Sequence, residues 1–221
     1  MLLDMIIDIL KTQYQYLIKI KFRSLIMITL TFKQNNNTIN LKANICKNTI
    51  LANYMDFKYF TGLCKEGCPH YNLNYTCPPN SPKFTEYTKD YKFSLVLALY
   101  MNIEKNHTLE EIHSYLRKVL SSILIPLEKE FCGLLTDGGR CQYCEKCTYI
   151  DNLPCRYPDK IRFSMEAMGL DLDKICKDIL NHNIMWDKKN ENIYCTVLGS
   201  INFNKDISEN DFKNAISRLL K

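Results

Sequence analysis

Four cysteines within fifteen residues constrain this sequence more than any other feature. They are Cys141, Cys144, Cys147 and Cys155, spaced Cys-x2-Cys-x2-Cys-x7-Cys. Two successive Cys-x2-Cys steps place three thiolates around one small volume, and a fourth thiolate from a short loop can complete the set. The spacing therefore predicts a metal site, with a four-iron (4Fe-4S) cluster as the first interpretation. A structural zinc ion, which more often uses two separated cysteine pairs, and unligated thiols are the alternatives.

The residues that flank this set suit a metal-binding loop. Gly138 and Gly139 precede the first cysteine and allow tight turns, which can point backbone amides toward sulfur atoms. Arg156 follows the last cysteine. It is a candidate for neutralising the negative charge of a cluster or holding an anion, and a plain surface contact is the alternative.

A second cysteine set lies earlier in the chain, where Cys64, Cys68 and Cys77 occur among several prolines. Three thiolates have no obvious fourth partner in the same loop. An incomplete set leaves an open coordination position, at which a substrate or a sulfur atom can bind. Alternatively His70, Cys46 or another cysteine completes a closed structural site. The sequence thus predicts a second metal centre and leaves its fourth ligand open.

Composition narrows the functional class. The chain has eleven cysteines, an odd number, which argues against a secreted disulfide framework and for reduced thiols in the cytoplasm. The net charge of +5 comes from scattered lysines, so no nucleic-acid footprint is visible. No phosphate-binding loop, Ser-His-Asp pattern or pair of catalytic carboxylates stands out. Whether the chain is an enzyme is left open.

The remaining cysteines and histidines favour structural roles. Cysteines in apolar or helical contexts usually behave as small buried hydrophobes. On this basis the expected core cysteines are Cys132, Cys176 and Cys195. Histidines without partners at ligand spacing are expected at surface or helix positions, and these are His107, His113 and His182.

The first residues do not resemble a targeting or membrane segment. Asp4 and Asp8 interrupt the first apolar run, and charged residues also interrupt the run from 17 to 32. We therefore expect no membrane span. The expected organisation is a poorly defined N-terminal extension over 1–26 and a single cysteine-rich metal-binding domain over 27–221.

Hydrophobic periodicity predicts alternating strands and helices. Strands are expected over 25–32, 38–45, 93–101 and 193–203, with 93–101 as a central strand buried on both faces. Helices are expected after Thr108, Asp171 and Ser208, which can act as N-caps. The glycines and prolines among residues 62–82 predict an irregular loop there. The expected fold class is α/β or α+β, a single mixed-sheet domain with flanking helices and two cysteine-rich metal-binding loops.

Taken together, the ordered motifs resemble one family. They are Cys64-Lys65-Glu66-Gly67-Cys68-Pro69-His70-Tyr71, Cys77-Pro78-Pro79, the Cys141 to Cys155 set with Arg156-Tyr157-Pro158, and Ser164-Met165-Glu166-Ala167-Met168-Gly169-Leu170-Asp171. Over about residues 57–200 the chain is similar to the predicted metal-binding proteins called domain of unknown function 2284. The resemblance implies metal binding through the seven cysteines, in prokaryotes that are often anaerobic. Asn72 stands where glycine is expected, which implies a different turn there, and Arg140 stands where proline is common.

The sequence therefore favours a cytoplasmic iron–sulfur protein with an electron-transfer or redox role. One or two 4Fe-4S clusters are the expected cofactors, with zinc as the alternative. A redox protein is the expected partner, and nucleic acid is not. Two other functions are kept: an enzyme that uses an open-site cluster for sulfur or Lewis-acid chemistry, and a zinc-stabilised structural or binding module.

Overall fold

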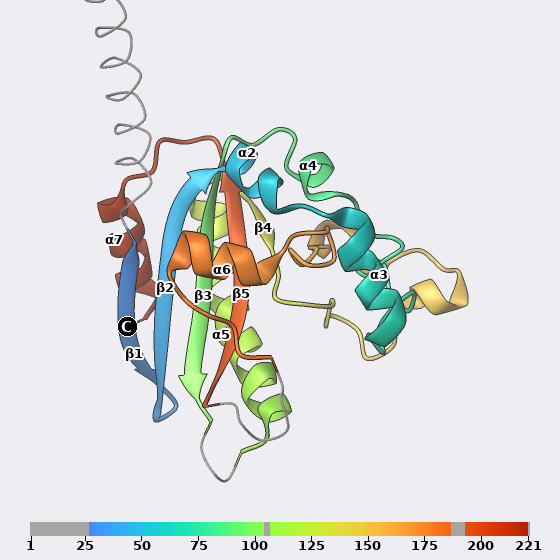
Figure 1. Cartoon of the computed structure of the whole chain (residues 1–221), viewed down its shortest axis with the longest axis horizontal. Helices are drawn as coiled ribbons and strands as arrows, with labels where there is room; N and C mark the ends of the chain where they lie inside the picture. Colours follow the sequence, from blue (N-terminus) through green and yellow to red (C-terminus); the bar gives the residue numbers. More distant parts are fainter. Residues whose placement is uncertain (1–26, 104–106, 187–192, 221) are drawn as a thin grey trace, which may run out of the picture.

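The computed structural model of the chain describes residues 27–103, 107–186 and 193–220 (Figure 1). Its centre is a five-stranded sheet in the order β1-β2-β3-β5-β4. The strands are β1 (Ile28–Gln34), β2 (Asn37–Lys47), β3 (Phe93–Asn102), β4 (Leu134–Thr136) and β5 (Tyr194–Phe203). All four pairings are antiparallel rather than mixed, so of the two expected fold classes this is α+β. The expected N-terminal extension, 1–26, lies outside the described residues.

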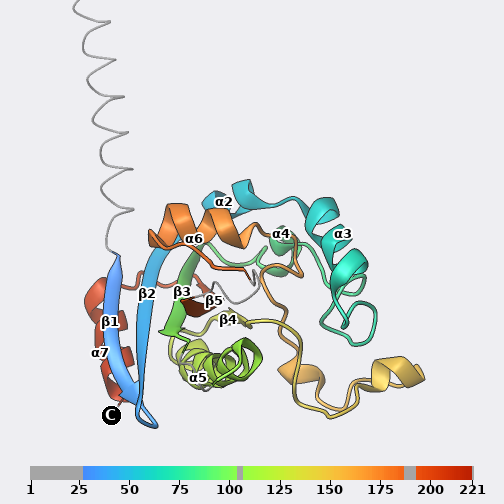
Figure 2. The same cartoon turned by 60° about the horizontal axis from the view of Figure 1, so that its bottom comes forward.

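Helices cover both faces of the sheet (Figures 1 and 2). One face packs on α5 (Leu109–Glu130) and α7 (Glu209–Leu219), and the other face packs on α6 (Leu172–Leu180). Two short helices, α2 (Asn48–Leu51) and α4 (Phe84–Tyr87), lie on the α6 side. Along β3, Leu95 and Leu97 face α5 while Val96 and Ala98 face α6, which confirms the expected central strand.

The predicted caps and hairpin are confirmed. Thr108 and Ser208 each form a capping box, and Asp171 accepts a hydrogen bond from the Lys174 amide. Between β1 and β2, Asn35 and Asn36 both have positive φ, as two-residue hairpin turns require. Each feature depends on neighbours in sequence, which explains why the pattern could predict it.

Three expectations were wrong. Residues 57–67 form helix α3 (Phe57–Gly67), which Asp56 caps and which ends before Pro69, whereas a loop was expected from Gly62 onward. Cys132 is exposed in the turn after α5, while Cys176 and Cys195 are buried as expected. His182 is buried although a surface or helix position was expected; His107 and His113 are exposed. No helix of the described residues is long and apolar enough to cross a membrane.

The buried His182 should make stability depend on pH. Its ring stacks on Tyr100 and shares a 3.0 Å hydrogen bond with Thr196. Burial, with a contribution from Lys42, lowers the pKa of His182 from 6.5 to about 4. Below pH 6.5 the unfolded chain therefore binds a proton that the folded chain does not bind. We expect the free energy of unfolding to fall by up to about 3 kcal/mol between pH 7 and pH 4.

Urea unfolding of the wild type and of His182→Gln at several pH values checks this expectation. The glutamine keeps a hydrogen-bonding partner for Thr196 but does not titrate, so its stability should depend less on pH. An identical loss of stability in the two proteins between pH 7 and pH 4 would contradict the assignment.

Candidate metal centre

The two cysteine sets lie in one lobe beside the β4 edge of the sheet. The lobe consists of a first segment, residues 57–80 with α3, and a second segment, residues 138–160, which follows directly from β4. Figures 1 and 2 show the two segments side by side in both views. The fold therefore brings together two cysteine sets that are far apart in the sequence.

Tyrosines join the outer parts of the two segments. The Tyr75 hydroxyl donates a 2.7 Å hydrogen bond to the Leu153 carbonyl, and the Tyr149 hydroxyl donates one of 2.7 Å to Asn72 Oδ1. The rings of Tyr75 and Tyr149 meet edge to face, with centroids 5.2 Å apart. Asn72 has a φ of 56°, which lies in the left-handed region that glycine favours.

A second junction lies at the start of the second cysteine set. The Cys141 amide donates to the Thr76 hydroxyl at 3.0 Å, one residue before Cys77. Arg140 Nε donates to His70 Nε2 at 3.1 Å. The backbone at Cys141 is thus hydrogen-bonded directly to the loop that carries Cys77.

The four cysteines of the second set lie on one loop and have free thiols. They are half-buried and form no disulfide. Cys147 precedes the 3-10 helix η2 (Thr148–Asp151), and Cys155 precedes η3 (Pro158–Lys160). The Arg156 guanidinium donates to the Lys146 carbonyl at 2.9 Å, so it braces the loop. Lys160 Nζ lies 5.2 and 5.0 Å from the ring centres of Tyr143 and Tyr157, which closes the loop on its other side.

Backbone amides point at sulfur atoms in this loop. The Tyr157 amide donates to Cys155 Sγ at 3.4 Å, and the Tyr143 amide donates to Cys141. Burial raises the pKa of Cys141; the Tyr143 amide opposes this, and the other three thiols add to it. The other three thiols would therefore repel the Cys141 sulfur when they are ionised to thiolates. A bound cation would remove that repulsion.

The first set shares its surroundings with a carboxylate. Cys64 lies on α3, Cys68 ends that helix, and Cys77 is buried beside Asn74. Burial raises the pKa of Cys64 to about 11, with further contributions from Cys68, Glu166 and Cys77. The three thiols and the Glu166 carboxyl thus occupy one region. The expectation from sequence gave Glu166 no role.

Two proposed fourth ligands are otherwise engaged. His70 Nε2 accepts the hydrogen bond from Arg140. Cys46 packs among the apolar residues beneath α6, where burial raises its pKa to about 12. Neither His70 nor Cys46 is therefore placed to act as the fourth ligand beside the three thiols.

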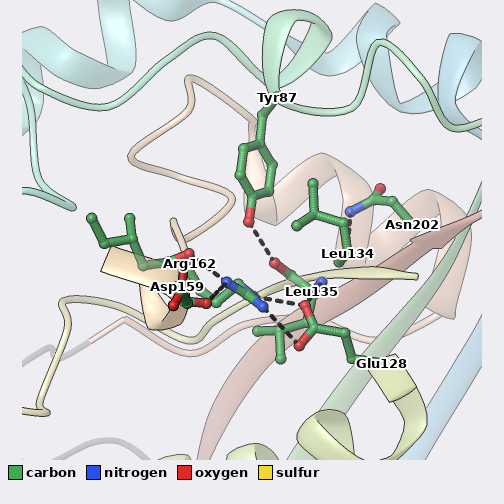
Figure 3. Close-up of polar contacts among 8 residues, drawn as sticks. Tyr87, Glu128, Leu134, Leu135, Asp159, Arg162 and Asn202 are labelled. Atoms are coloured by element: carbon green, nitrogen blue, oxygen red, sulfur yellow. Dashed lines mark hydrogen bonds and ion pairs between the residues drawn. The ribbon is translucent and has the colours of Figure 1, made fainter. Parts of the chain in front are cut away.

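The Ser164 to Asp171 motif braces the lobe against the sheet domain. Ser81 donates to the Ala167 carbonyl at 2.6 Å, and the Asp56 amide, at the start of α3, donates to the Gly169 carbonyl at 2.9 Å. The other end of the second segment is held by Arg162, which forms two hydrogen bonds with Glu128 of α5, 2.6 and 3.0 Å long (Figure 3). The lobe is therefore tied down at both segments.

The cysteine sulfur atoms are the donors that a thiophilic metal prefers, but in this structure they are not arranged around a common centre. Among the described residues, no group of three or more His, Cys, Asp or Glu side chains is arranged to hold a metal ion. The second set nevertheless offers four reduced thiols in one loop with amide donors to two of them. Metal binding would draw these sulfur atoms together, so binding and loop conformation would be coupled.

Comparison with known proteins gives one match. The family model described as "Predicted metal-binding protein (DUF2284)" matches residues 55–199. No curated protein and no solved structure matches the chain at a significant level. The matched range covers both segments of the lobe, the Ser164 to Asp171 motif, β3, β4 and the first part of β5, while β1 and β2 lie outside it.

Gly169 should be required for the lobe to dock. Its φ is +88°, and a Cβ atom there would lie 2.5 Å from the Cα of Phe57, the first residue of α3. We expect Gly169→Ala to lower the free energy of unfolding by about 2–4 kcal/mol, because α3 must move or the backbone must strain. Gly62→Ala is the matched control: it has open space within α3 and should stabilise by up to about 1 kcal/mol. Equal effects of the two substitutions in urea unfolding would contradict this role.

Proposed function

We propose that this chain, which belongs to the DUF2284 family of predicted metal-binding proteins, holds a four-iron cluster on Cys141, Cys144, Cys147 and Cys155. Cys64, Cys68 and Cys77 hold a second metal centre, and the protein has an electron-transfer or redox role. The observation that carries the proposal is the joining of two reduced cysteine sets in one lobe by direct contacts.

The preference for iron–sulfur over zinc rests on spacing and on hydrogen bonds to sulfur. Three thiols at successive steps of three residues suit three corners of a cubane cluster. Amide donors to Cys141 and Cys155 would stabilise negative charge on those sulfur atoms. When bound, such a cluster supplies reversible one-electron chemistry. The chain itself holds the sulfur atoms, donates the amide hydrogens and fixes the loop through Arg156 and Lys160.

An enzyme with an open coordination position is the second candidate. The first set offers three thiols, while His70 and Cys46 are engaged elsewhere. A metal held by three protein ligands can bind a substrate or sulfur atom at its free position. On this proposal Cys68→Ser abolishes turnover and leaves the cluster on the second set intact. A zinc-stabilised module, the third candidate, would instead show stoichiometric zinc, no charge-transfer absorption and unfolding by chelators.

The surface of the lobe suits an electron-transfer partner. Seven of the ten exposed large hydrophobic residues in the described ranges lie on it. They are Tyr59, Leu63, Leu73, Tyr143, Ile150, Leu153 and Tyr157. Exposed apolar side chains grouped in this way are typical of protein-binding surfaces. The proposed partner is a redox protein that docks on the lobe.

Substitution of single cysteines tests the assignment. We expect Cys144→Ser, purified and reconstituted without oxygen, to lose about four irons per chain and the matching labile sulfide relative to wild type, because a proposed cluster ligand is removed. Cys132→Ser is the control, since Cys132 is exposed and lies outside the lobe. The proposal fails if Cys144→Ser retains the iron and sulfide content of the wild type, or if Cys132→Ser loses as much.

A further inference from the structure

Arg117 is a buried cation behind the second cysteine set. It lies on α5, on the side that faces the lobe, and only 7% of its surface is exposed. Nη2 donates a 2.6 Å hydrogen bond to the Arg140 carbonyl. Nε is buried and has no hydrogen-bond partner among the described residues.

The backbone of the second segment is shaped around this side chain. Gly139 has a φ of +106°, and a Cβ atom at that position would lie 3.2 Å from Arg117 Cζ. The guanidinium therefore packs directly against the turn that leads into Cys141. Through the Arg140 carbonyl it also supports the residue that contacts His70. Arg117 thus touches the junction between the two segments from the sheet side.

The charge of Arg117 is incompletely balanced. Burial lowers its pKa, while Asp137, Glu166 and Cys141 favour the charged form. Within the described residues neither carboxylate forms an ion pair with it. A buried cation without a paired anion costs several kcal/mol, and arginine does not escape this cost by losing its proton. The two carboxylates thus act on Arg117 without direct contact, and its buried Nε has no hydrogen-bond acceptor among the described residues.

We infer that Arg117 is the buried counter-cation of an anionic metal–thiolate centre at the Cys141 set. The inference rests on the proposed function and adds a positioning residue to it. A cluster held by four thiolates carries net negative charge, and a fixed neighbouring cation favours its reduced form. Arg117 ligates nothing; it balances charge and holds the Gly139 and Arg140 turn in place.

Arg117→Met and Arg117→Lys test this role, with Lys118→Met as the matched control because Lys118 is the exposed neighbour on α5. Each protein is reconstituted without oxygen from ferrous iron and sulfide. Iron content, midpoint potential and melting temperature are measured, the last with and without the cluster. In Arg117→Met the equilibrium constant for reduction should fall about tenfold, or about 59 mV to more negative potential. Arg117→Lys should shift by less than half of this, and Lys118→Met should not shift.

Melting temperatures distinguish charge balance from ordinary packing. Arg117→Met removes a buried charge that has no ion-pair partner, together with its hydrogen bond to the Arg140 carbonyl. The melting temperature should therefore fall more in the loaded protein than in the metal-free protein, each compared with wild type in the same state. An equal drop in both states with an unchanged potential would overturn the inference and leave a purely structural arginine. The inference would also be overturned if phosphate stabilised metal-free wild type but not metal-free Arg117→Met, and the substitution left iron content and midpoint potential unchanged. Arg117 would then bind a free anion rather than balance the charge of the cluster. Wild type that takes up less than one iron per chain would overturn the proposed function itself.

Discussion

The contact between the two cysteine segments is the interaction on which the rest of the lobe depends. Two hydrogen bonds, from the Cys141 amide to the Thr76 hydroxyl and from Arg140 to His70, fix the start of one cysteine set on the loop of the other. Without this junction each set would be a separate surface loop attached to the sheet. With it, seven thiols belong to one structural unit. Arg140 and Asn72, the two departures from the expected family pattern, both make contacts across the junction.

Charge is the second constraint on this unit. Burial raises the pKa of Cys64 and of Cys141, and the neighbouring thiols raise it further, so these groups resist becoming thiolates. A metal would reverse both effects, since it turns mutual repulsion into shared ligation. The buried Arg117, which we infer to be the counter-cation of this centre, has no hydrogen-bond partner for its Nε among the described residues. On the proposed function, the charges of the lobe would be balanced most fully with the thiolates and a metal present together.

Sequence predicted the parts that depend on local pattern. Capping boxes at Thr108 and Ser208 and the buried run of β3 follow from neighbouring residues, and the family and its metal binding follow from cysteine spacing. Helix α3 was missed because its glycines and the prolines that follow it outweighed the cap at Asp56. The roles of Arg117 and His70 were also missed. Their partners lie 23 and 70 residues away, and no local pattern encodes such pairings.

The most direct test is the absorption spectrum of wild-type protein purified without oxygen, before and after dithionite, with iron and labile sulfide counted on the same sample. The account predicts visible charge-transfer absorption that dithionite bleaches, with about four irons and four sulfides for the Cys141 set and additional metal if the Cys64 set is filled. Zinc without sulfide, and no visible absorption, would contradict the redox role and leave a lobe whose thiols serve folding.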